Sequence, residues 1–338
     1  MNRREFFKNG SLLAGGIMLS RFDLPAANAK FKPRKVPAGE KVNLACIGVG
    51  NRAADIIKEL YKTGHCNIVA LCDTDMGAPH TLEIMRKFPK AKQFQDFREM
   101  FDKVSNQIDA VCIGTPDHSH FAATMLSMSL GKHVFVEKPM AHTFNEVELM
   151  MRGAKKYGVV TQMGNQGHSE ANYFQFKAWK EAGIIKDVTA ITAHMNNPRR
   201  WHKFDPNMKS MPAAEPVPAS LDWDTWLGTE FWHDYNKDYI NGQWRCWYDF
   251  GMGALGDWGA HILDSAHEFL ELGLPTEINM LYAKGHNKFF FPYSSTIEFK
   301  FPERKGMPAC DVTWYDGIDN LPRSEEHTSE LQSHLNLV

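Results

Sequence analysis

This 338-residue chain lacks several features that mark other classes of protein. It has no excess of basic residues, because 38 Lys and Arg stand against 40 Asp and Glu for a formal net charge of −2. No basic run is long enough to follow a phosphate backbone, so we expect no nucleic acid as a partner. The six cysteines form no CxxC pair and no zinc-ligand spacing, and Cys46, Cys72 and Cys112 fall in apolar segments. We therefore expect buried free thiols and no disulfide framework.

A long apolar run is also missing, and residues 1–29 read as an export leader. Arg3-Arg4 is followed by two phenylalanines and a weakly apolar, Gly-rich run, and Ala27-Asn28-Ala29 supplies an A-x-A cleavage site. The run is too short and too rich in glycine for a transmembrane helix, so we expect no membrane span. Twin arginines followed by phenylalanine resemble a twin-arginine (Tat) signal, which predicts export of a folded protein, to the periplasm for example. A linker containing Pro and Lys follows over residues 30–41.

The C-terminal residues 323–338 differ from the rest of the chain. Residues 323–334 read RSEEHTSELQSH, and every residue fits the translation of a widely used short-read sequencing adapter. We expect natural sequence to stop near Pro322 and the true C-terminus to be missing, so this tail is excluded from fold reasoning. A natural polar, acidic tail is the alternative.

The segment 42–53, VNLACIGVGNRA, carries the signature of a dinucleotide-binding loop. A short apolar strand over 42–47 leads into Gly48-x-Gly50-x-x-Ala53 and then into a helical pattern. Gly48 permits the tight turn, Gly50 lets the backbone approach a pyrophosphate, and Ala53 lets the helix pack closely on the strand. The helix N-terminus directs N–H groups and a positive dipole end at the pyrophosphate.

Asp73 follows the next predicted strand, residues 67–72. An acidic residue at this position accepts hydrogen bonds from the adenosine ribose. No Arg occurs in the following ten residues to hold a 2′-phosphate. We therefore expect NAD rather than NADP as the cofactor.

Strand and helix patterns alternate as far as residue 163. The expected helices cover residues 52–61, 81–88, 97–103, 118–130 and 144–157, and the further strands cover 92–94, 109–113, 133–136 and 159–162. Nearly continuous apolar strands that alternate with helices predict a parallel sheet with both faces covered. Ligands of such sheets bind at the carboxyl ends of the strands, where Thr115, Pro116, His118, Glu137 and Lys138 lie.

From residue 164 the pattern changes and predicts a second domain. A helix over 169–182 and a strand over 188–195 precede a Pro- and Trp-rich stretch at 197–249. A helix over 257–272 and strands over 277–282, 295–301 and 309–314 follow. Strands without intervening helices predict a mainly antiparallel sheet. We expect a Rossmann domain over 42–163 and a substrate-binding α/β domain over 164–322.

Three residues are candidates for proton and charge transfer. Lys138 follows a strand, and its ammonium suits a developing alkoxide, although a surface lysine paired with Glu137 is the alternative. Asp257 and His261 are four residues apart in a predicted helix and so share one face. His261 suits the role of general base, with Asp257 orienting the imidazole, and a buried structural pair is the alternative. We expect no metal site, because His118 and His120 lack an acidic partner.

The GVGNRA loop, Glu137-Lys138-Pro139 and GALGDWGAHILD at 253–264 together resemble the Gfo/Idh/MocA oxidoreductase family over about residues 42–322. The resemblance implies an N-terminal Rossmann doubly wound parallel sheet and a C-terminal α+β domain with an open, mainly antiparallel sheet. That sheet normally has more strands than remain here, which fits truncation, and we expect the full-length protein to form homo-oligomers through it. The family pattern implies Lys138, Asp257 and His261 as catalytic residues. The expected cofactor-binding residues are Gly48, Gly50, Asn51, Arg52, Asp73, Thr115, Pro116, His118, Glu137, Lys138 and Gln166.

Seven of the nine tryptophans lie between residues 201 and 258. Aromatic rings stack on the C–H faces of sugars, so a sugar or glycoside is the expected substrate class, with an aromatic core as the alternative. The expected substrate-binding residues are Lys138, His168, Arg200, Trp201, Trp247, Asp257 and His261.

Three functions follow from these residues. The favoured one is an NAD-dependent oxidoreductase acting on a sugar or glycoside with a tightly bound cofactor, because little NAD is free to exchange outside the cytosol. The second is an NAD-dependent glycoside hydrolase that oxidises C3 transiently and eliminates the aglycone. The third is a non-catalytic sugar-binding protein.

Overall fold

The computed structural model describes residues 31–195, 205–240 and 242–322. The predicted leader, the adapter-like tail, Arg200 and Trp201 lie outside these residues. Within them no helix combines the length and the apolar character that crossing a membrane requires.

Six parallel strands form the first sheet, in the order β3-β2-β1-β4-β5-β6. They are β1 (Val42–Ile47), β2 (Cys66–Cys72), β3 (Lys92–Phe94), β4 (Ala110–Ile113), β5 (His133–Glu137) and β6 (Thr161–Gly164). The connecting helices are α2 (Asn51–Lys62), α3 (Pro79–Lys87), α4 (Phe97–Val104), α5 (His120–Ser129) and α6 (Phe144–Tyr157). The strand order reverses between β1 and β4, which opens a crevice at their carboxyl ends. This confirms the predicted Rossmann sheet.

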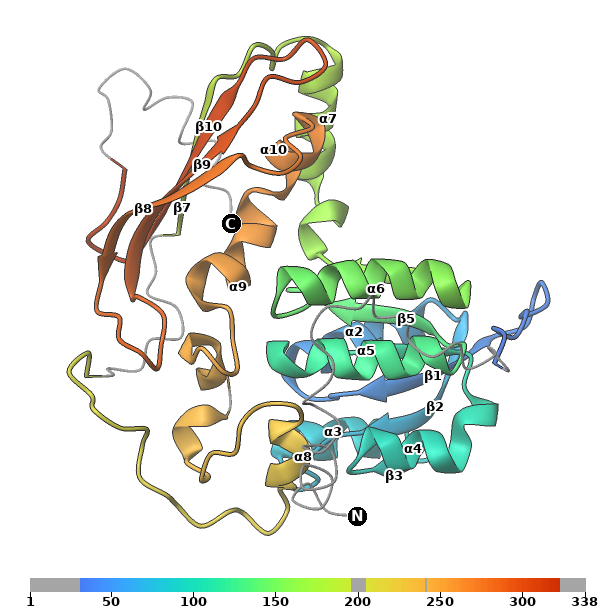
Figure 1. Cartoon of the computed structure of the whole chain (residues 1–338). Helices are drawn as coiled ribbons and strands as arrows, with labels where there is room; N and C mark the ends of the chain where they lie inside the picture. The colour runs from blue at the N-terminus through green and yellow to red at the C-terminus, as the bar shows by residue number, and fades with distance from the viewer. Residues whose placement is uncertain (1–30, 196–204, 241, 323–338) are drawn as a thin grey trace, which may run out of the picture.

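Helices cover both faces of this sheet, as the apolar strands predict (Figure 1). Side chains of β1 alternate between two cores, with Leu44 and Cys46 packed against α2 and α3. Ala45 and Ile47 pack on the other face, against α4, α5 and α6. All six cysteines of the chain are buried free thiols, and burial raises the pKa of Cys112 to about 12.

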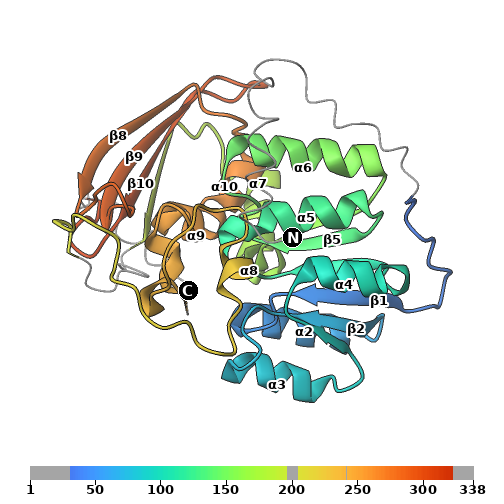
Figure 2. The ribbon, with the colours of Figure 1, turned by 60° about the horizontal axis from the view of Figure 1, so that its bottom comes forward.

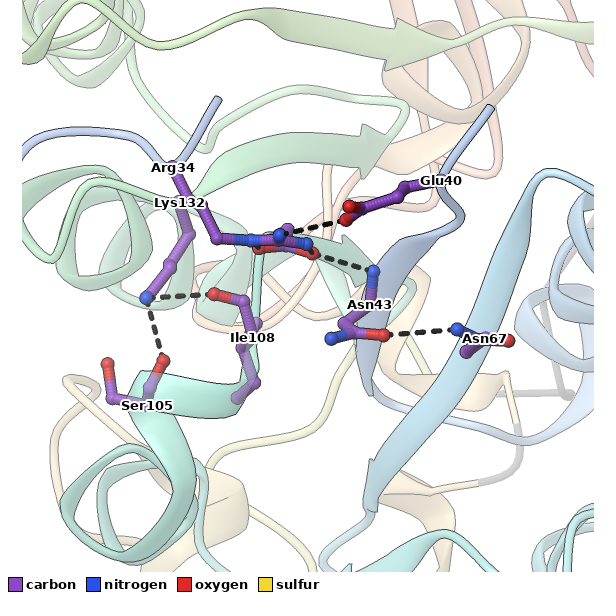
Figure 3. Close-up of polar contacts among 8 residues, drawn as sticks. Arg34, Glu40, Asn43, Asn67, Ser105, Ile108 and Lys132 are labelled. Carbon is purple, nitrogen blue, oxygen red and sulfur yellow. Dashed lines mark hydrogen bonds and ion pairs between the residues drawn. The ribbon is translucent and has the colours of Figure 1, made fainter. Parts of the chain in front are cut away.

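The linker segment 31–41 packs against the amino ends of β1 and β4 (Figure 3). The Arg34 guanidinium donates to both carboxylate oxygens of Asp109, at 2.6 and 2.7 Å. Asp109 also accepts a hydrogen bond from the Asn43 backbone N–H at 2.9 Å. The Arg34 guanidinium accordingly lowers the pKa of the Asp109 carboxyl. A bidentate ion pair of this kind fixes the linker at the edge of the sheet opposite the crevice.

The second domain contains a mixed four-stranded sheet in the order β7-β10-β9-β8. Its strands are β7 (Ala190–Met195), β8 (Glu277–Lys284), β9 (Ser294–Phe301) and β10 (Cys310–Asp316). β8, β9 and β10 pair antiparallel, and β7 pairs parallel with β10. Helices α7 (Ala171–Glu181), α9 (Gly253–Ile262) and α10 (Asp264–Phe269) lie on one side of the sheet (Figure 1). The sheet is thus mainly antiparallel, as expected.

The helix expected over 257–272 is wrong in its bounds, because the structure has two helices and the first begins at Gly253. Asp257 therefore lies in the middle of α9 and not at a helix start. Short 3₁₀ turns complete the described elements: Ser105–Gln107, Asp117–Ser119, Gln166–Ser169, Lys237–Tyr239 and Gln243–Cys246.

The Trp-rich stretch folds back onto the Rossmann domain. Its helix α8 (Trp223–Leu227) lies beside that domain in both ribbon views (Figures 1 and 2). Trp223, Tyr239, Trp247 and Phe250 are buried together in an aromatic core. Trp247 is fully buried and donates its indole N–H to the Asp238 carbonyl at 3.1 Å. The expected substrate contact of Trp247 is therefore wrong, because the ring packs inside the domain.

Candidate active site

A cavity of about 650 Å³ lies at the carboxyl ends of the Rossmann strands and is walled on its other side by the second domain. Most of the predicted cofactor residues line it: Gly48, Gly50, Asn51, Arg52, Asp73, Thr115, Pro116, Glu137, Lys138 and Gln166. Asp257 and His261 line the same cavity. The fold thus brings the glycine loop and the three predicted catalytic residues to one space.

The glycine loop has no room for a side chain at either of its two glycines. Gly48 has φ +74°, and a Cβ there would lie 2.8 Å from backbone atoms of Gly114 and Thr115. A Cβ on Gly50 would lie 1.9 Å from Cδ2 of His80. α2 begins directly after Gly50, so its first N–H groups face this bare loop. The arrangement fits the pyrophosphate of a dinucleotide.

Asp73 is held rigidly at the end of β2. Its carboxylate accepts hydrogen bonds from the N–H groups of Val49 (2.9 Å) and Asp75 (3.0 Å). Burial raises the pKa of the Asp73 carboxyl, and the two backbone N–H groups oppose that shift. The carboxylate is thus oriented beside the glycine loop, where the signature places an adenosine ribose.

Lys138 and Asp257 form an ion pair across the cavity wall. The Lys138 ammonium lies 2.6 Å from Asp257 Oδ1 and 2.8 Å from the Asp257 carbonyl oxygen. The Arg245 guanidinium lies 3.2 Å from the same Oδ1. The side chains of Lys138 and Asp257 are only 11% and 6% exposed. The alternative of a surface lysine paired with Glu137 is therefore wrong.

Asp117 is a site residue that the sequence reasoning missed. It lines the cavity, is 3% exposed, and its Oδ2 is buried without a hydrogen-bond partner in the described part of the chain. Burial raises the pKa of the Asp117 carboxyl to about 8, Asp257 adds to the rise, and Arg245 and Lys138 oppose it. With Asp117 protonated, the cluster that it forms with Lys138, Arg245 and Asp257 carries two positive charges and one negative charge. The sequence feature that could have identified Asp117 is its position directly after Thr115-Pro116, at the carboxyl end of a strand.

His261 is oriented by Asn165. The ring Nδ1 lies 3.1 Å from Asn165 Oδ1, while Asn165 Nδ2 donates to the Ala260 carbonyl at 2.8 Å. Because an amide oxygen faces Nδ1, that nitrogen carries the proton and Nε2 is left as the basic nitrogen. Asn165 thus positions the imidazole, while Asp257 binds Lys138 and Arg245.

Two predicted histidine contacts are corrected by the structure. His118 is 3% exposed, and its ring nitrogens lie against the carbonyl oxygens of Trp226 (2.8 Å) and Phe250 (3.3 Å), so it cannot contact a cofactor ribose. His168 does not line the cavity, and its Nε2 pairs with Asp264 at 2.5 Å. Neither site was readable from the sequence, because both sets of partners lie far along the chain.

His120 has a role that the sequence did not reveal. Its ring nitrogens lie against the carbonyl oxygens of Pro139 (2.7 Å) and Thr115 (2.8 Å), and burial lowers its pKa to about 4. It thereby connects the two strand-end loops that carry Thr115 and Lys138. Among residues 31–195, 205–240 and 242–322 no cluster of three His, Cys, Asp or Glu side chains suits a metal ion.

A Rossmann domain and an α/β domain enclose one cleft, which is the two-domain fold of NAD-binding oxidoreductases. Residues 42–165 match the family model of the oxidoreductase family with an NAD-binding Rossmann fold, and residues 176–288 match the C-terminal α/β domain of that family. The chain therefore belongs to the Gfo/Idh/MocA oxidoreductase family.

Similar proteins fall into two groups. A glycosyl hydrolase family 109 protein of Shewanella pealeana is 31% identical over 243 residues, and an alpha-N-acetylgalactosaminidase of Shewanella oneidensis is 26% identical over 241 residues. Each match covers 60% of this chain and 51% of the relative, so the chain spans about half the length of these relatives. Among solved structures, the WlbA dehydrogenase of Bordetella pertussis in complex with NADH and UDP-GlcNAcA is 17% identical. It has a TM-score of 0.59, with 82% of this chain and 72% of that chain covered.

Proposed function

We propose that this protein transfers a hydride between a hydroxyl-bearing carbon of a sugar or glycoside and a nicotinamide cofactor in the cleft. One observation carries the proposal: the Lys138 ammonium and the His261 imidazole line the same cavity as the glycine loop and Asp73. The cofactor, when bound, supplies the hydride acceptor. The protein must then stabilise the developing negative charge, accept a proton and line the substrate pocket.

Lys138 and His261 divide the proton and charge chemistry between them. The Lys138 ammonium, held by Asp257, donates a hydrogen bond to the substrate oxygen and stabilises its developing negative charge. His261 Nε2 takes the hydroxyl proton, and Asn165 fixes the ring for this step. Both groups are partly buried, which strengthens their electrostatic effect on the reacting oxygen.

Two tryptophans and an arginine support a sugar as the substrate. Trp244 and Trp258 line the cavity, and the Arg245 guanidinium lies 4.1 Å from the centre of the Trp244 ring. Aromatic faces suit the C–H faces of a sugar ring, and a guanidinium suits its hydroxyl oxygens or a carboxylate. The proposed export through the twin-arginine leader favours a cofactor that stays bound between turnovers.

The second candidate is an NAD-dependent glycoside hydrolase, which the two Shewanella relatives favour. In such a cycle the first step is the same hydride transfer from C3. Oxidation at C3 acidifies the C2–H bond, the aglycone leaves by elimination, water adds, and the hydride returns. The cycle is therefore redox-neutral, and Lys138 and His261 keep their roles in its first and last steps.

A single panel separates the candidates. Purified protein is analysed for bound nucleotide and incubated with free sugars and aryl glycosides, including an α-N-acetylgalactosaminide. The oxidoreductase produces the NADH absorbance band without releasing aglycone, whereas the hydrolase releases aglycone without a net change in that band. Protein that binds sugar equally well as wild type and as His261→Ala, with neither signal, overturns both proposals in favour of a sugar-binding protein.

A further inference from the structure

A segment of the second domain is fastened to the part of the Rossmann domain that follows Asp73. Residues 218–226, called the strap below, run antiparallel to the β2–α3 connection, with a bridge between Asp75 and Leu221. The Asp222 N–H donates to the Thr74 carbonyl at 2.8 Å, and the Met76 N–H donates to the Ser220 carbonyl at 3.1 Å. The strap thus extends the loop that carries the ribose-binding acid.

Two polar side chains reinforce this attachment. Gln95 Nε2 lies 2.8 Å from the carbonyl oxygens of both Thr74 and Ser220 and so bridges the two domains. The Ser220 hydroxyl donates to Asp75 Oδ1 at 2.7 Å. A Cβ on Gly77 would lie 2.5 Å from the Ser220 Cβ, so a glycine at that position allows the close approach.

The far end of the strap is anchored as well. His118 Nε2 lies 2.8 Å from the Trp226 carbonyl oxygen, and the Trp226 ring stacks on Trp223 with centroids 4.7 Å apart. Both ends of the strap are therefore fixed. Leu221, Thr225 and Trp226 line the same cavity as Asp73.

Rossmann geometry places the adenosine ribose at the acid that ends the second strand, which is Asp73 here. The strap contributes Leu221, Thr225 and Trp226 to the lining of the cavity that Asp73 also lines. We propose that the strap forms the outer wall of the adenosine subsite and that its fastening by Gln95 and Ser220 keeps the dinucleotide bound. This inference rests on the proposed function, because it requires a nicotinamide dinucleotide in the cleft.

The proposal makes cofactor release depend on opening the strap. A dinucleotide whose adenosine lies under the strap cannot leave until the bonds of Gln95 and Ser220 break. Gln95 and Ser220 together make three side-chain hydrogen bonds, one of them to a carboxylate, so their loss should ease opening by at least about tenfold. Both release and uptake should become faster, because both pass through the open state.

The test measures dissociation rates of the full chain. Protein loaded with NADH is mixed with excess NAD, and the decay of bound-NADH fluorescence gives the release rate. The same protein loaded with ADP-ribose is mixed with NADH, and the fluorescence rise gives the release rate of the adenosine half. The variants are Ser220→Ala and Gln95→Ala/Ser220→Ala. The control is Gln107→Ala, whose side chain accepts a bond from Lys92 at the other end of the Rossmann domain.

We expect the double variant to release both NADH and ADP-ribose at least about tenfold faster than wild type. Ser220→Ala should lie between the two, and Gln107→Ala should match wild type. Unchanged release of both ligands overturns the inference, and so does faster release of NADH alone, since the strap would then act elsewhere. Ser220→Ala keeps the test decisive if the double variant does not fold. Wild-type protein that binds neither ligand overturns the proposed function itself, whereas bound NAD that a sugar reduces in all variants upholds it.

Discussion

The ammonium nitrogen of Lys138 lies 2.6 Å from Oδ1 of Asp257, and the two residues are 119 positions apart in the chain. One follows β5 of the Rossmann domain and the other lies in the middle of α9. The pair therefore joins the two domains at the cavity and fixes the position of the ammonium. Since both side chains are largely buried, removing Asp257 leaves the Lys138 ammonium poorly compensated, whereas Asp257 without Lys138 keeps Arg245.

Lys138→Ala should lower the rate of hydride transfer to the bound cofactor by roughly 100- to 1000-fold, because the developing oxyanion loses its charged donor. Single-turnover reduction of bound NAD measures this step. The double variant Lys138→Ala/Asp257→Ala should raise the activation free energy by less than the sum of the increases in the two single variants, since the residues act as a unit. Lys132→Ala is the control, because Lys132 donates to the Ser105 and Ile108 carbonyls away from the cavity. Additive losses would show that the pair is not coupled.

Asp117→Asn should change how stability depends on pH. The carboxyl has a pKa of about 8 in the folded chain and about 4 when unfolded, so folding takes up a proton between these values. The contribution of Asp117 to stability is therefore full below about pH 4 and falls as the pH rises towards 8. Relative to wild type, the free energy of unfolding of the variant should therefore rise by about 3 to 4 kcal/mol between pH 5 and pH 8.

Urea unfolding at the two pH values measures this difference. Asp311→Asn, which changes an exposed carboxylate on β10, is the control. Identical pH dependence of wild type and Asp117→Asn would mean that Asp117 is already ionised in the folded protein at pH 5.

Gly50→Ala should fold and yet lose cofactor. The added Cβ would meet only the movable His80 ring, but it would stand between the backbone and the pyrophosphate. We expect NADH affinity to fall by at least about 100-fold, measured by fluorescence titration, with little change in the thermal midpoint. Gly48→Ala is the contrasting variant, because its Cβ would meet fixed backbone at a φ of +74°, and it should lower the midpoint as well. Equal NADH affinity in Gly50→Ala and wild type would show that the pyrophosphate does not bind at this loop.

Asn165→Ala should slow hydride transfer by about 10- to 100-fold while NADH affinity stays the same. Without its amide oxygen the His261 ring loses the bond that fixes its tautomer and orientation. The rate constant and the affinity are measured separately, in single-turnover reduction and in titration. Asn67→Ala, which removes an exposed bond to Asn43, is the control. A loss confined to NADH affinity would assign Asn165 to cofactor binding instead.

Local sequence predicted much of the Rossmann domain. Val42–Ile47, Lys92–Phe94 and Phe144–Tyr157 have the bounds that their patterns indicate. The reason is that a strand, a glycine turn or a capped helix depends on neighbouring residues. Thr143 and Glu146, for example, form a capping box at the start of α6.

The candidate site was predictable only in part. Lys138, Asp257 and His261 were named from short motifs, and they do line one cavity. Asp117 was missed, and the contacts of Asn165 with His261 and of Arg245 with Asp257 were not predicted, because these partners lie on other elements. The tryptophans were ambiguous for the same reason. Trp244 and Trp247 both belong to the aromatic core, but only Trp244 also lines the cavity.

The sequence by itself therefore determined the order of the strands and helices and the dinucleotide signature, since both are encoded over short stretches of backbone. The tertiary structure decided which polar groups meet. His118 turned inward to carbonyl oxygens, Asn165 took the place beside His261, and the strap reached the loop after Asp73. These outcomes depend on desolvation and on contacts between residues distant in the chain, which no local pattern specifies.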